Sequence, residues 1–149
     1  MNNNKLPNIS FERITGAKYQ QDVLYELLKK RKHNISHKSV PSKYEHNRFI
    51  KSHPYRAWYL IHNNNRCIGS TYLQKNNCIG INIINNDFEI LISVLKFIFK
   101  HHKPLKEIKS ERPPNFYINV APNNIKMRSQ LSLIGAKKIQ ITYALDSEL

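Results

Sequence analysis

The chain has 149 residues, and 24 Lys and Arg against 10 Asp and Glu give it a formal net charge of +14 at pH 7. This length is typical of a single domain, here 1–149, and a composition that is 40% hydrophobic excludes a disordered polyelectrolyte. The N-terminus lacks the apolar core of a signal peptide, and Ser93 and Lys96 interrupt the longest apolar stretch. Cys67 and Cys78 fit neither a disulfide framework nor a metal-ligand spacing. We therefore expect a cytoplasmic protein with reduced thiols and no membrane span.

The first third of the sequence predicts one strand and two helices. Residues 9–14 alternate apolar and polar side chains, which indicates a half-buried strand. Apolar residues then recur at helical spacing over 19–28, and this helix is expected to end in the basic run 29–33. Ser42 with Glu45 three residues later has the form of a capping box, which predicts a second helix over 44–51.

The middle third predicts an antiparallel meander followed directly by a helix. Three β-rich runs between residues 55 and 84 are separated by the polar turns NNNR and QKNN. Asn86 is the expected N-cap of the next helix, with Glu89 at the third helical position. The apolar stripe of that helix consists of Leu91, Val94, Leu95 and Ile98.

The last third predicts two more strands around one helix. Residues 116–121 have strand composition, a helix is expected to begin at Asn124 and to stop at Gly135, and 138–145 again alternate with period two. The resulting order, β α α β β β α β α β, predicts an α/β (α+β) fold with a mixed, mostly antiparallel central sheet flanked by helices.

This element order and the segment 120–145 resemble the C-terminal half of the GNAT (GCN5-related N-acetyltransferase) superfamily. The matching positions of the segment are Pro122, Asn124, Gly135, Ala136 and Tyr143. The strands between Trp58 and Ile83 also resemble the central hairpin of the family, so the likeness runs from Trp58 to Leu145.

The resemblance implies an N-acetyltransferase that moves an acetyl group from acetyl-CoA to a primary amine of a small molecule or a peptide. In the family fold two neighbouring parallel strands, here 79–83 and 117–121, splay apart and bind acetyl-CoA in the gap. Backbone groups of the first strand would hold the pantetheine arm, and the N-terminus of the following helix would hold the pyrophosphate. The residues expected to contact the cofactor are Ile81, Asn82, Ile83, Asn86, Asp87 and Asn124.

The sequence departs from the family pattern at the groups that perform the chemistry. The phosphate loop of the family is rich in glycine, whereas 84–89 (INNDFE) contain no Gly and no basic residue. The usual acidic Tyr of the last helix falls on Leu131, and the usual basic Glu falls near Cys78. The substitutes available for catalysis are Tyr117, Asn119 and Tyr72, although each of them would serve equally well in packing or in hydrogen bonds within the sheet.

Two other functions remain open from the sequence. The same departures fit a non-catalytic GNAT-like domain that binds another ligand or a partner. The basic cluster 29–33 fits a nucleic-acid-binding module, although the same cations are favourable at a helix C-terminus and no nucleic-acid motif accompanies them. The seven His residues lack metal-ligand spacing, so no metal site is expected, and Cys78 is expected to be a buried thiol rather than a nucleophile.

Overall fold

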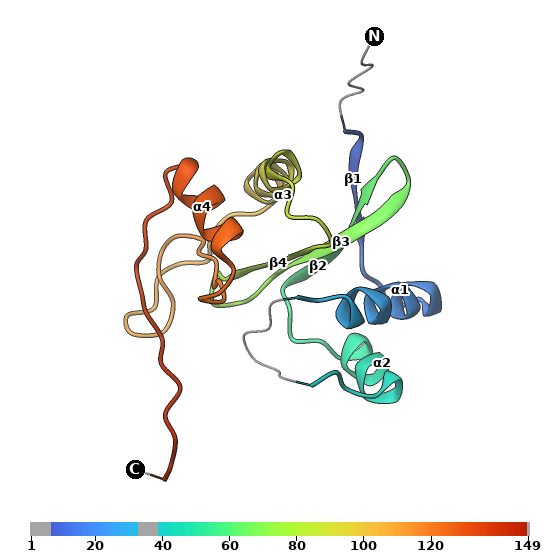
Figure 1. The fold of residues 1–149 in the computed structure, drawn as a ribbon, viewed down its shortest axis with the longest axis horizontal. Coiled ribbons are helices and arrows are strands. Elements are labelled where there is room, and N and C mark those ends of the chain that lie inside the picture. The colour runs from blue at the N-terminus through green and yellow to red at the C-terminus, as the bar shows by residue number, and fades with distance from the viewer. Residues whose placement is uncertain (1–6, 33–38, 149) are drawn as a thin grey trace.

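The computed structural model describes residues 7–32 and 39–148, and it has a four-stranded antiparallel sheet at its centre (Figure 1). The strands follow one another in the order β1 (Ile9–Arg13), β2 (Ala57–Asn63), β3 (Arg66–Leu73) and β4 (Ile79–Ile83). The helices are α1 (Lys18–Lys29), α2 (Lys43–Lys51), α3 (Phe88–His101) and α4 (Ile125–Leu133). The predicted α+β class, with helices that flank the sheet, is confirmed. No helix in the described ranges combines the length and the apolar character needed to cross a bilayer.

Strand β2 is buried on both faces because helices cover both sides of the sheet. Trp58 and Leu60 point to one face and pack with α1 and α2, while Tyr59 and Ile61 point to the other face and pack with α3. Alternate side chains of a strand point to opposite faces, so an apolar run from Ala57 to Ile61 is what a strand between two helical layers needs.

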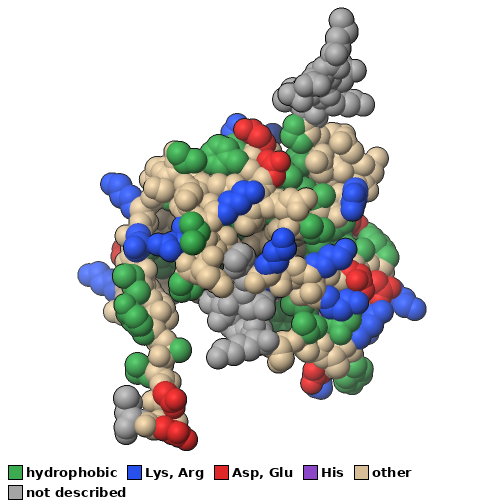
Figure 2. All heavy atoms as spheres, viewed as in Figure 1, with side chains coloured by type: hydrophobic (Ala, Val, Ile, Leu, Met, Phe, Trp, Pro, Cys, Tyr) green, Lys and Arg blue, Asp and Glu red, His purple; other side chains and the backbone are tan. Residues whose placement is uncertain are grey.

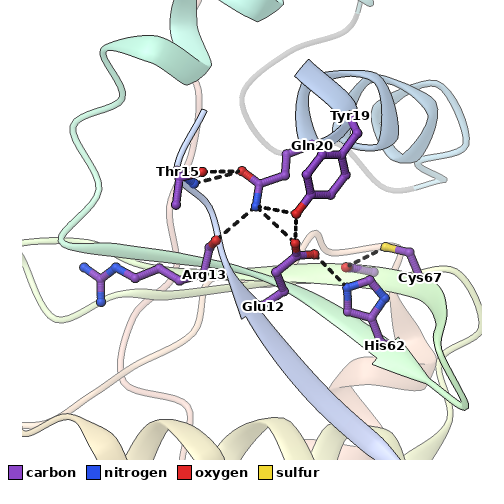
Figure 3. A network of polar contacts seen from close by, with 8 residues as sticks. Glu12, Arg13, Thr15, Tyr19, Gln20, His62 and Cys67 are labelled. Carbon is purple, nitrogen blue, oxygen red and sulfur yellow. Dashed lines mark hydrogen bonds and ion pairs between the residues drawn. The ribbon is translucent and has the colours of Figure 1, made fainter. Parts of the chain in front are cut away.

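A polar network holds α1 against the first two strands (Figure 3). The amide of Gln20, which is 1% exposed, accepts hydrogen bonds from the backbone N–H groups of Thr15 and Gly16 and donates one to the carbonyl of Arg13. Glu12 accepts a hydrogen bond from Tyr19 and lies 3.0 Å from Nε2 of His62. The network satisfies the backbone of the turn between β1 and α1, and it fixes the direction in which α1 leaves the sheet.

The caps of the helices agree with the sequence at three ends and differ from it at one. The capping box of Ser42 and Glu45 is present at α2, and Asn124 caps α4 by accepting a hydrogen bond from the backbone N–H of Met127. Gly135, with φ +84°, follows the end of α4 as predicted.

At α3 the prediction of Asn86 as N-cap is wrong by one residue. The cap is Asp87, whose carboxylate accepts from the backbone N–H groups of Glu89 and Ile90 at 2.8 and 3.4 Å. Asn86 is instead tied to α4, because its carbonyl accepts a hydrogen bond from Gln130 and its amide lies 3.4 Å from the amide oxygen of Asn124. The expected apolar stripe of α3 is buried, as predicted.

The two strands predicted for the C-terminal third are corrected by the structure. Residues 116–121 make a single parallel bridge, between Tyr117 and Cys78, and 138–145 form no strand in the described chain. Beyond Gly135 the chain is extended and leaves the body of the molecule (Figure 1). Alternating side chains make a segment suitable for a strand, but a strand exists only beside another strand, and 138–145 have no neighbouring edge here.

Candidate functional site

A wedge-shaped cleft separates β4 from the segment 117–121, because the two are paired at one end only. The backbone N–H of Ile79 donates to the carbonyl of Tyr117 at 2.8 Å, and the N–H of Tyr117 donates to the carbonyl of Asn77 at 3.2 Å. From there toward Ile83 and Ala121 no hydrogen bond joins the two described backbones. A cavity of about 610 Å³ lies along this opening.

The register of the sheet shows which backbone groups of β4 face the cleft. The N–H of Gln74 donates to Cys78 and the N–H of Ile84 donates to Ile68, so the pairs at even positions of β4 are the hydrogen-bonded ones. Backbone groups at odd positions therefore point away from β3. Ile79 uses its N–H on Tyr117, whereas the N–H and C=O groups of Ile81 and Ile83 have no partner in the described chain. Both residues line the cavity.

One wall of the cavity is aromatic. Tyr72 lies directly opposite Gly80 in the register of β3 and β4, and its ring occupies the space that a side chain at Gly80 would need. Tyr55 stacks on this ring with the centroids 4.1 Å apart, and burial raises the pKa of the Tyr55 hydroxyl well above its ordinary value. The basic residues Lys30 and Arg31, which follow α1, also line the cavity.

The other end of the cavity lies between the N-termini of α3 and α4, and these two helix ends differ in charge. Asp87 at the N-cap and Glu89 in the first turn place two carboxylates at the N-terminus of α3. The first turn of α4 has no acidic residue, and it carries Lys126, which lines the cavity. An anion is stabilised by a helix N-terminus and by a cation, so α4 rather than α3 offers the favourable position for a phosphate.

The structure brings most of the predicted site residues to this one cleft. The predicted residues that line the cavity are Ile81, Asn82, Ile83, Asn86, Asn124, Tyr72 and Asn119. Tyr117 and Asp87 are not among the lining residues; the first lies at the closed end of the wedge and the second caps α3. Phe88, which would exclude a ligand if it filled the junction, does not line the cavity either. The roles of these residues remain predictions.

The sequence offered no argument for Lys126 as part of the site. Its position two residues after the cap Asn124 was the available signal, because such a residue must lie in the first turn of the helix. Arg31 was noticed only as a member of a basic cluster, since its place at the cleft depends on how α1 packs on the sheet.

The described lining of the cleft includes no Asp, Glu or His side chain. Cys78 lines it but is 5% exposed, burial raises the pKa of its thiol, and the amide of Asn119 lies 3.5 Å from its sulfur. A thiol with a raised pKa is a poor nucleophile at neutral pH. Leu131 packs against the core between the sheet and α3. Within the described chain, no group of three or more His, Cys, Asp or Glu residues is placed to hold a metal ion.

Comparison with known proteins supports the fold of this site. No known protein family and no curated protein matches the sequence. The structure is similar to a crystal structure described as that of a possible acetyltransferase from Clostridium difficile 630, with a TM-score of 0.55 and 12% sequence identity. The match covers 93% of this chain and 97% of the other one. The fold is therefore acetyltransferase-like, and at this identity the likeness extends to the fold alone.

Proposed function

We propose that this protein is an N-acetyltransferase, which moves the acetyl group of acetyl-CoA to a primary amine of a small molecule or a peptide. The observation that carries the proposal is the unpaired backbone of Ile81 and Ile83 along an open cleft. Unpaired N–H and C=O groups at partly buried positions need partners, and a ligand with amide groups supplies them. The pantetheine arm of coenzyme A contains two such amides in an extended chain.

The cleft also suits the two ends of that cofactor. A volume of about 610 Å³ is within the range of sites for small molecules and cofactors, which is roughly 300–1,000 Å³. The pyrophosphate would lie at the N-terminus of α4 beside Lys126, away from the carboxylates of Asp87 and Glu89. The acetyl thioester would then lie near the closed end of the wedge, where Asn119 and Tyr72 line the cavity.

In the proposed reaction the nitrogen of the neutral amine attacks the thioester carbonyl. The C–N bond forms, the C–S bond breaks, the nitrogen loses a proton to water, and the coenzyme A sulfur receives one. Tyr72 is our candidate for the donor of this last proton, with Asn119 as a hydrogen-bond donor to the thioester; Tyr117 is the predicted catalytic residue outside the cavity lining. Holding the two reactants together supplies much of the rate of such a transfer.

Calorimetric titration with acetyl-CoA and with coenzyme A tests the binding step. We expect binding by the wild type and clearly weaker binding by Lys126→Glu, because the substitution replaces a cation beside the phosphates with a carboxylate. Lys96→Glu is the matched control, since Lys96 is an exposed residue of α3 outside the cavity lining and the change in net charge is identical. Absence of binding by the wild type refutes the proposal, and equal weakening by both variants refutes the position of the phosphates.

Release of free thiol from acetyl-CoA, measured with a panel of amines, tests the chemical step. We expect Tyr72→Phe to lower kcat about 10²-fold or more if its hydroxyl is the acid, with a smaller effect on KM. The absence of Asp, Glu and His from the described lining favours a second candidate, a domain that binds coenzyme A without turnover. Binding without thiol release for every amine would support this second candidate and contradict the first.

A further inference from the structure

The segment after α4 presents an apolar stripe that nothing in the described chain covers. Ile139, Ile141, Tyr143 and Leu145 are 71, 64, 80 and 86% exposed. The segment 137–148 makes no hydrogen bond to any other part of the described chain. Figure 2 shows patches of hydrophobic atoms along the arm that leaves the body of the molecule. Four neighbouring apolar side chains on an extended arm are a surface that favours a partner.

The sequence of this arm is complementary to itself. Suppose that two copies pair antiparallel with Thr142 opposite Thr142. A residue of one copy then lies opposite the residue of the other copy that is equally far from Thr142 on its other side. The apolar pairs are then Ile139 with Leu145 and Ile141 with Tyr143, all on one face. On the other face Lys138 lies opposite Asp146, so opposite charges meet at both ends of the ribbon.

Other registers lose this agreement. A shift of the pairing by two residues in one direction places Ile139 opposite Ser147, and a shift in the other direction places Leu145 opposite Lys137. A shift by one residue in either direction places one isoleucine of the stripe opposite Ala144 and the other three stripe residues opposite polar or charged side chains. The register centred on Thr142 is therefore the one that satisfies both faces.

We propose that the segment 138–146 pairs with the same segment of a second copy of this chain, antiparallel and about a two-fold axis at Thr142. We choose a second copy as the partner because Lys138 and Asp146 of the arm have opposite charges and face each other when the arm pairs with itself. Binding to an unrelated protein would not require this match within the arm. A two-stranded ribbon needs an apolar cover, and the exposed apolar side chains at the end of α4, Leu133 and Ile134, provide it at the base of each arm. This inference is independent of the proposed function.

A single cysteine on the proposed axis tests the pairing. Thr142→Cys is expected to form a disulfide between two copies under mild oxidation, because residues directly opposite one another have their Cα atoms roughly 4.5–5.5 Å apart. Gln140→Cys alone and Ala144→Cys alone are the controls, since each would lie about 13 Å from its own copy. A mixture of these two variants is expected to form the mixed disulfide. Peptide mapping without reduction distinguishes these bonds from any that involve Cys67 or Cys78.

The oligomeric state completes the test. We expect the wild type to sediment as a dimer and Ile141→Asp to sediment as a monomer with the helical part of its circular dichroism unchanged, because Ile141 is exposed within one chain and its loss leaves the fold of that chain intact. Lys138→Glu is expected to weaken the dimer, and Lys138→Glu with Asp146→Lys is expected to restore it. A wild type that stays monomeric over a dilution series, or equal cross-linking at residues 140, 142 and 144, overturns the proposal.

Discussion

Replacement of Gly80 by Ala tests the aromatic wall of the cleft. A Cβ atom at Gly80 would lie 2.0 Å from Cζ of Tyr72 and 2.3–2.4 Å from its two Cε atoms, far inside van der Waals contact. The ring must therefore leave its position when residue 80 gains a methyl group. Its departure also breaks the stack with Tyr55, in which the rings are 4.1 Å apart and nearly parallel.

The expected cost follows from these contacts. Overpacking of this kind costs about 1–3 kcal/mol, and loss of an aromatic pair costs about 0.5–1.5 kcal/mol. The gain from replacing a glycine inside a strand is roughly 0.5–1 kcal/mol. We therefore expect Gly80→Ala to lower the free energy of unfolding by about 0.5–4 kcal/mol, measured by urea denaturation. The corresponding decrease in Tm is about 2–4 °C for each kcal/mol.

The same substitution in a protein that already lacks the Tyr72 ring tests this reasoning. With Tyr72→Ala already in place the ring is absent, so the added methyl group at residue 80 meets no clash. Gly80→Ala is then expected to be neutral or to stabilise the protein by up to roughly 1 kcal/mol, because the entropic benefit alone remains. An equal loss of stability in both backgrounds would show that the ring of Tyr72 does not decide the cost at this position.

Three further predictions concern other parts of the chain. Asp87→Ala is expected to lower the free energy of unfolding by about 1 kcal/mol in urea denaturation, more than Asn86→Ala does, because Asp87 caps α3. Burial lowers the pKa of His46 in the folded state, so the unfolded chain binds a proton at a higher pH than the folded chain does. The free energy of unfolding should therefore fall as the pH drops from about 6.5 through the folded pKa, and His46→Gln should reduce that fall in denaturation curves. Burial raises the pKa of the Cys78 thiol, so a disulfide reagent at neutral pH should modify Cys78 only after unfolding, and prompt labelling would contradict this.

The sequence was sufficient for elements whose structure depends on local chemistry. The capping box of Ser42 and Glu45 and the stop at Gly135 are decided by a few neighbouring atoms, and both occur where they were predicted. The positions of the three meander strands also agree, because the polar turns between β2, β3 and β4 fix the limits of these strands. The cap of α3 was misplaced by one residue because Asn86 and Asp87 are both good caps, and the side-chain amide of Asn86 is directed to the amide oxygen of Asn124 instead.

The location of the candidate site was predicted, but some of its residues were not, because their positions depend on packing between elements far apart in the sequence. The place where β4 and the segment 117–121 diverge followed from a resemblance, and the structure has a cavity there. Lys126 was missed, because its position depends on how α4 packs beside α3. The sequence also could not show that Asp87 and Glu89 leave α4 as the better end for a phosphate, since that comparison needs both helix ends at the same cavity.

The cleft and the C-terminal arm both contain a strand-like segment whose backbone is not fully paired. Residues 117–121 and 138–145 both have strand sequences, and both leave backbone groups without partners in the described chain. Side-chain alternation predicts the ability to form a strand, but the partner of that strand is a separate matter. At Ile81 and Ile83 the unpaired groups face a cavity with polar residues at its end, so a small ligand with amide groups fits. On the arm the unpaired groups lie beside an exposed stripe that matches itself, and a second copy of the chain fits better.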